Sequence, residues 1–211
     1  MKIHKFVFSP ISVNTYVLAD SDGLCAVIDC GCYDEGEFKR LTDFLDSNRL
    51  KPELLLNTHC HLDHIFGNAM FLRRFGLKTM ACIKEEENRI NSQNHAMLFG
   101  MEMETPPEIG TYISDRQIIS FGSVKLEAIY VPGHTAGSIA YYSKDEGCVF
   151  TGDALFAGGI GRTDLPGGNY EQLIESIRSG LLTLPPETVV YPGHGESSTI
   201  GNEKATNRWL S

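Results

Sequence analysis

The sequence of 211 residues has no long hydrophobic run and no excess of basic residues. Residues 1–9 hold no apolar segment long enough for a signal peptide, and no stretch approaches the length of a membrane span. The net charge is −9, and no basic stripe of the kind that binds nucleic-acid phosphates is visible. We therefore expect a cytoplasmic protein whose partner is neither a membrane nor a nucleic acid.

Paired cysteines and a serine nucleophile motif are also lacking. The six cysteines have no Cys-x-x-Cys spacing, which predicts reduced thiols. No Gly-x-Ser-x-Gly elbow is present, and the glycine run at 158–161 matches neither the dinucleotide-binding nor the P-loop spacing. We interpret that run as a turn.

What the sequence does have is histidine in short motifs, which contain five of its seven histidines. In the first motif His59 and His61 are two residues apart, so on extended backbone they point the same way and Cys60 points away. If a helix begins just after them, Asp63 and His64 turn toward a second position nearby. His4 and His95 lie outside the motifs, and we expect no function of them.

Two metal ions roughly 3.5–4 Å apart that share a water need about seven protein ligands. Nitrogen and carboxylate ligands suit zinc, iron or manganese, and zinc is the default expectation. The motifs supply a set of this size: His59, His61, Asp63, His64, His134, Asp153 and His194.

This pattern resembles the metallo-β-lactamase superfamily over nearly the whole chain. The resemblance implies an α/β fold, a four-layer αββα sandwich forming one domain over residues 1–211, with the metals at one sheet edge. Residues 57–64, 161–168 and 191–195 are similar to the short, single-domain glyoxalase II-like (hydroxyacylglutathione hydrolase-like) hydrolases.

The resemblance also implies roles for individual residues. One metal would be held by His59, His61 and His134, and the other by Asp63, His64 and His194. Asp153 would bridge the two ions, and we assign catalytic roles to Asp63 and Asp153. Asp29 matches a carboxylate that steadies the ligands; the alternative is an aspartate that ends a buried strand for reasons of turn geometry.

The predicted enzyme is a binuclear metal-dependent hydrolase. Two divalent ions, most simply zinc, lower the pKa of a bridging water toward 7, and the resulting hydroxide would attack the carbonyl of an acyl thioester. S-lactoylglutathione or a related small molecule is the expected substrate, although the sequence lacks the C-terminal domain and the tyrosines by which long glyoxalase II enzymes grip glutathione. We expect Arg162 to bind a substrate carboxylate, with an ion pair to Asp164 as the alternative.

One rival interpretation is a persulfide dioxygenase of the same superfamily, which carries similar motifs. That branch binds one iron, and the corresponding ligands here would be His59, His134 and Asp153. Its glycine-turn cysteine is replaced by Ile160. A second rival, a non-catalytic protein with the same fold, would be expected to have lost ligands. The acyl group, the thiol, the metal and the oligomeric state are left open.

Alternation and turn signals predict the order of elements. A methionine-rich segment at 84–110 is expected to be helical, and either packs in the core or covers the site. Asn169 with Gln172 indicates a helix cap. Strands are predicted at 2–8, 14–19, 24–29, 54–56, 78–83, 117–121, 124–131, 138–143, 147–152 and 187–191, and further helices at 35–49, from 65, from 169 and at 198–210.

Overall fold

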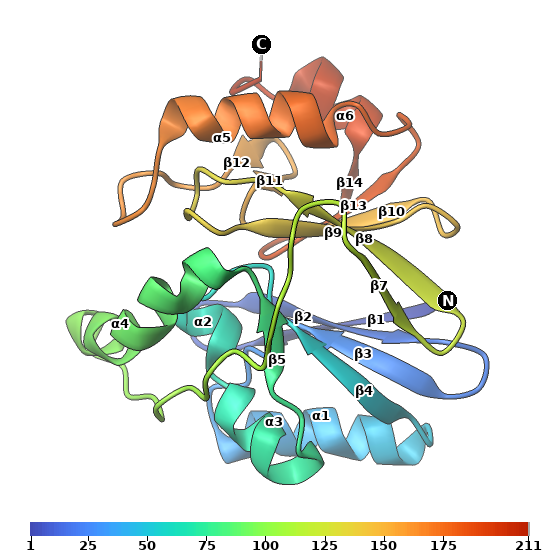
Figure 1. Cartoon of the computed structure of the whole chain (residues 1–211), viewed down its shortest axis with the longest axis vertical. Coiled ribbons are helices and arrows are strands. Elements are labelled where there is room, and N and C mark those ends of the chain that lie inside the picture. Colours follow the sequence, from blue (N-terminus) through green and yellow to red (C-terminus); the bar gives the residue numbers. More distant parts are fainter. Residues whose placement is uncertain (211) are drawn as a thin grey trace. The chain divides into compact units, whose positions relative to one another are not determined.

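The computed structural model describes residues 1–210, which divide into two compact units. The first unit is Met1–Tyr112 with Ser120–Val124, and the second is Ile113–Ile119 with the chain from Lys125 onward. Each unit is built on a β-sheet with helices against it, and Figure 1 shows the elements of both. The predicted α/β class is confirmed, while the prediction of a single domain stays a prediction.

The first unit contains a sheet in which the strand order follows the sequence. Strands β1 to β3 are antiparallel neighbours, and β3 to β6 pair in parallel. Parallel pairing brings the ends of β3 and β4 to the same sheet edge. The strands are β1 (Lys2–Phe8), β2 (Val13–Ala19), β3 (Leu24–Ile28), β4 (Lys51–Leu56), β5 (Thr79–Ala81) and β6 (Thr111–Tyr112).

Helices α1 and α3 lie along one face of this sheet (Figure 1). The side chain of Asp34 accepts the N–H of Glu37 at 2.8 Å and so begins α1. Phe38, Leu41 and Leu45 then fall on one helical face and are buried in the core of the unit. The helical elements are α1 (Glu35–Ser47), α2 (Leu62–Ile65), α3 (Asn68–Phe75), a 3₁₀ turn η1 (Ile83–Glu85) and α4 (Glu86–Leu98).

The prediction of helix throughout 84–110 is wrong in its second half. Helix α4 ends at Leu98, Gly100 adopts a left-handed φ of 68°, and the N–H of Met101 returns to the carbonyl of Ala96. This is how a glycine ends a helix, and two prolines at 106–107 prevent its renewal.

The helix predicted from residue 65 is also interrupted. Gly67 separates α2 from α3, and its N–H donates to the carbonyl of Cys30 at 2.8 Å. A Cβ at this position would lie 2.5 Å from the Cys30 sulfur, so only glycine fits there.

The second unit contains a sheet of order β14-β13-β10-β9-β8-β7. Its core includes Leu173, Ile177 and Leu181 from α5 and the π-helical turn η2 that follows it. The elements are β7 (Ile118–Phe121), β8 (Val124–Tyr130), β9 (Ile139–Ser143), β10 (Cys148–Gly152), the β11 (Leu155–Phe156) and β12 (Gly159–Ile160) hairpin, α5 (Tyr170–Ser176), η2 (Ile177–Leu181), β13 (Val189–Pro192), β14 (Ser198–Thr199) and α6 (Ile200–Thr206).

Two local predictions for this unit have different outcomes. The cap is confirmed, since the side chain of Asn169 accepts the N–H of Gln172 at 2.9 Å. The terminal helix predicted at 198–210 is too long: Ser198 and Thr199 pair with β13 instead, and α6 ends at Thr206.

All six cysteines are buried and none forms a disulfide; the reduced state of the thiols stays a prediction. In the described part of the chain, none of the helices combines the length and the apolar character needed to cross a membrane.

Candidate metal centre

Most of the predicted ligands follow the carboxyl ends of two parallel strand pairs, while His134 follows β8, which pairs antiparallel with β9. In β3 and β4 Ile28 pairs with Leu56, so Asp29 and the loop 57–61 leave the first sheet at the same edge. In β10 and β13 Gly152 pairs with Pro192, so Asp153 and His194 leave the second sheet together. We call His59, His61, Asp63 and His64 the first half-site, and His134, Asp153 and His194 the second half-site.

Asp29 is the acceptor at the base of the first half-site, and only 1% of its surface is exposed. One carboxylate oxygen accepts the Thr58 N–H at 2.8 Å and the side-chain amide of Asn57 at 3.3 Å. The other accepts the Thr58 hydroxyl at 2.7 Å and Nδ1 of His64 at 2.9 Å. Asp29 also has a left-handed φ of 53°. Turn geometry accounts for that φ, but not for the four hydrogen bonds.

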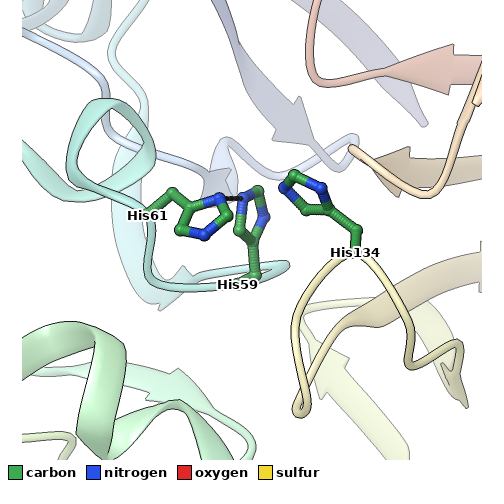
Figure 2. Close-up of side chains that lie close together, drawn as sticks. All are labelled: His59, His61 and His134. Atoms are coloured by element: carbon green, nitrogen blue, oxygen red, sulfur yellow. Dashed lines mark hydrogen bonds between the residues drawn. The ribbon is translucent and has the colours of Figure 1, made fainter. Parts of the chain in front are cut away.

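His59 is fully buried, and its ring is oriented from one side by Thr58. The Thr58 hydroxyl lies 3.1 Å from Nδ1 of His59; because it donates its proton to Asp29, it accepts from this nitrogen. Nε2 of His59 then lies 3.1 Å from Nδ1 of His61. Figure 2 marks this contact between the two rings with a dashed line. A cation bound by both nitrogens would replace the proton that they share.

Asp63 and His64 lie in the short helix α2, directly after these histidines. His64 donates Nδ1–H to Asp29, so Nε2 carries the lone pair of the ring. Nε2 lies 3.6 Å from a carboxylate oxygen of Asp63. This separation is too long for a hydrogen bond, and it is close to the ~3.4 Å between two ligands of a tetrahedral zinc ion.

The second half-site repeats this geometry around one oxygen of Asp153. Nε2 of His134 lies 3.7 Å from Oδ2 of Asp153, and Nε2 of His194 lies 3.6 Å from the same atom. Nδ1 of His134 donates to the backbone carbonyl of Arg162 at 2.8 Å, which turns Nε2 toward Asp153. Gly161 leaves room for this ring, because a Cβ there would lie 2.9 Å from Nδ1 of His134 and 1.9 Å from the Asp153 carbonyl oxygen.

The donor chemistry of both half-sites fits divalent cations. Within each half-site the facing donor atoms stand at ligand-to-ligand separations, and hydrogen bonds to Asp29, Thr58 and the Arg162 carbonyl orient three of the imidazoles. Among residues 1–210, the side-chain groups able to hold a metal ion draw on seven residues: His59, His61, Asp63, His64, His134, Asp153 and His194.

Cys60 does not belong to this set. It packs in a small core with Ile65, Ala81 and Ile109. Burial raises the pKa of its thiol well above the ordinary value.

Arg162 forms the ion pair that was the alternative to substrate binding. Its Nε and Nη2 each donate to one oxygen of Asp164 at 2.7 Å, in the bidentate geometry typical of the two groups. The guanidinium lowers the pKa of Asp164 to about 2, so the pair stays charged at neutral pH. Both side chains are exposed, and a substrate carboxylate would compete with Asp164.

Sequence reasoning assigned no role to Asn57, although it lies in the first motif. Its amide donates to the carbonyl of His64 at 2.9 Å, and its oxygen accepts from Asn68 and Thr79 at 2.8 and 2.6 Å. Asn57 thus connects the ligand loop to α3 and β5. A polar residue directly after the buried end of β4, Leu55 and Leu56, is the signal that could have indicated it.

The comparisons with known proteins agree with the predicted family. A model described as "Metallo-beta-lactamase superfamily" matches residues 9–194. The hydroxyacylglutathione hydrolase GloC of Haemophilus influenzae is 36% identical, with 100% of this chain and 99% of that protein covered. The protein named probable metallo-hydrolase YqgX of Bacillus subtilis is 35% identical, with 100% and 98% covered.

Solved structures show the same likeness. The BLEG-1 B3 metallo-beta-lactamase matches with a TM-score of 0.92 and 30% identity, over 100% of both chains. TTHA1623 in a di-iron-bound form matches at 0.89 and 32%, over 98% of this chain and 100% of that one. ETHE1 from Myxococcus xanthus matches at 0.81 and 27%, over 99% and 84%. The chain therefore has the predicted fold.

Proposed function

We propose that this chain, which belongs to the metallo-beta-lactamase superfamily and is a metal-dependent hydrolase, cleaves an acyl thioester at a binuclear metal centre. The observation that carries the proposal is the geometry of the half-sites. Each places imidazole nitrogens and a carboxylate oxygen at ligand-to-ligand distances, with ring orientation set by hydrogen bonds. We propose further that the two half-sites act together.

The proposed ligand assignment follows the family pattern. His59, His61 and His134 would hold one ion, and Asp63, His64 and His194 the other. Asp153 would bridge them, since a single carboxylate already has two imidazoles near one oxygen. Zinc is the simplest choice for these donors, and iron or manganese fit the same types of atom.

The two ions, when bound, would supply a hydroxide nucleophile at neutral pH, because coordination lowers the pKa of water from 15.7 to about 7. The protein's own contribution is orientation. Asp29 holds Nδ1 of His64 directly and Nδ1 of His59 through the Thr58 hydroxyl, so both rings present Nε2. A thiol leaving group needs little protonation, so no separate acid from the chain is required.

The substrate class is inferred from the curated relative that acts on a hydroxyacyl glutathione. Thioester hydrolysis consumes one water and yields a carboxylic acid and a thiol. We propose S-lactoylglutathione or a related small acyl thioester as the substrate. A cytoplasmic location stays a prediction.

Metal analysis paired with two activity assays tests the proposal. We expect about two zinc ions per chain and hydrolysis of S-lactoylglutathione or of another acyl thioester in a panel with and without glutathione. Metal-free protein that gains no hydrolysis on reloading would contradict the proposal. One iron per chain with oxygen uptake on glutathione persulfide, and no hydrolysis, would favour the alternative, a mononuclear-iron persulfide dioxygenase.

Arg162→Ala tests the proposed substrate-binding role. If the guanidinium pairs with a substrate carboxylate, KM for an acidic thioester rises about tenfold, as the loss of one exposed charge-assisted contact predicts, while kcat changes little. Asp164→Asn is the matched variant, because it removes the competing carboxylate and is expected to lower KM. An unchanged KM in both variants would leave Arg162 with its ion pair alone.

A further inference from the structure

We propose that Glu85 is a positioning residue of the first half-site, which holds the peptide group between His59 and His61. The inference rests on the proposed metal-binding role of these two histidines. Glu85 lies at the junction of the turn η1 and helix α4, 24 positions after His61 in the sequence. Its role would be to tie the loop 57–61, which carries His59 and His61, to helix α4.

Glu85 is fully buried, and one of its oxygens accepts two hydrogen bonds. Oε2 accepts the backbone N–H of Cys60 at 2.7 Å and the side-chain amide of Asn88 at 2.9 Å. Asn88 is one turn further along the same helix, so it fixes the carboxylate that in turn fixes Cys60. Burying a carboxylate is costly unless hydrogen bonds replace its lost hydration, and these two bonds contribute to that compensation.

The hydrogen bond from Cys60 to Glu85 acts on the backbone between two predicted ligands. Cys60 lies in the loop after β4, outside the strand, and its buried N–H needs an acceptor. His59 and His61 flank it, so one hydrogen bond restrains the backbone that carries both rings. A hydrogen bond to a carboxylate is stronger than one to a neutral acceptor.

Ordinary helix capping does not account for Glu85. It occupies the N-cap position of α4, yet its side chain makes no hydrogen bond that caps the helix. The carboxylate points to the ligand loop instead. Asp29 therefore restrains the rings of His59 and His64 from one side, while Glu85 restrains the backbone between His59 and His61 from another.

Variants at Glu85 and Asn88 test the inference. Glu87→Gln is the control, because Glu87 lies two residues after Glu85 and is exposed. The first readout is hydrogen exchange of the Cys60 amide by NMR in metal-free protein. The second is zinc affinity, measured by competition with a chelator. We expect Glu85→Ala to speed Cys60 exchange and to lower zinc affinity about 10–100-fold, the usual range for residues that orient ligands.

Glu85→Gln keeps an oxygen that can accept from both Cys60 and Asn88, so we expect a smaller loss than in Glu85→Ala. If Glu85→Ala does not fold, Glu85→Gln and Asn88→Ala test the inference instead. Both are expected to speed Cys60 exchange and to lower zinc affinity. Exchange and affinity equal to those of Glu87→Gln in every folded variant would overturn the inference. Absence of zinc binding in the unaltered protein would instead reject the proposed function.

Discussion

Asp153→Asn is expected to lower thioester turnover by more than about 100-fold, beyond the range typical of residues that only orient ligands. Oδ2 of Asp153 lies 3.6–3.7 Å from Nε2 of both His134 and His194, so it is the atom that faces both imidazoles of the second half-site. Asparagine has almost the same shape, but it is neutral and one of its two terminal atoms is an NH₂ group that cannot ligate a cation. The measurement is kcat together with metal content per chain.

Asp145→Asn is the matched control, because Asp145 is an exposed aspartate of the same unit. It should leave turnover and metal content unchanged. We expect Asp153→Asn to lose at least part of its metal while keeping the thermal unfolding of the metal-free protein close to that of the control. Full turnover in Asp153→Asn would mean that Asp153 is no ligand, and the assignment of a bridging carboxylate would then be wrong.

Much of the fold could be predicted from the sequence because its signals are local. The face formed by Phe38, Leu41 and Leu45 predicts α1, and the pair Asn169 and Gln172 predicts the cap of α5. The failures arise where tertiary contacts decide. Gly67 ends α2 because it packs against Cys30, a residue 37 positions earlier, and no pattern within the helix reveals that contact.

The candidate ligands could be named from the sequence because imidazoles and carboxylates lie close together along the chain, as in His59, His61, Asp63 and His64, and are the donors that divalent metals prefer. The groups that orient these ligands could not be predicted from the sequence. The acceptor of His134 is the backbone carbonyl of Arg162, and every residue has a carbonyl, so the sequence carries no mark of it. Glu85 is likewise one acidic residue in the run Glu85-Glu86-Glu87, and only burial distinguishes it.

Asp29→Ala is the second change for which we expect a large effect, and it acts on stability as well as on metal binding. The carboxylate accepts from the Thr58 N–H, the Thr58 hydroxyl, the Asn57 amide and Nδ1 of His64, and all four donors are buried. Removing it leaves these donors without their acceptor, and the loss of a charged acceptor costs about 3 kcal/mol in the free energy of unfolding. Zinc affinity should also fall about 10–100-fold.

The two effects separate if unfolding is measured with and without a chelator. In chelator the free energy of unfolding reports the hydrogen bonds alone; with excess zinc it also contains the metal-binding free energy, because a ligand of the native state stabilises that state. Asp22→Ala, an exposed aspartate beside the same sheet, is the control and should match the unaltered protein in both conditions. A loss of stability in chelator that does not grow with zinc would show that Asp29 serves the fold alone. A larger loss with zinc means that the hydrogen bonds to Thr58 and His64 also prepare the rings of His59 and His64 for the metal.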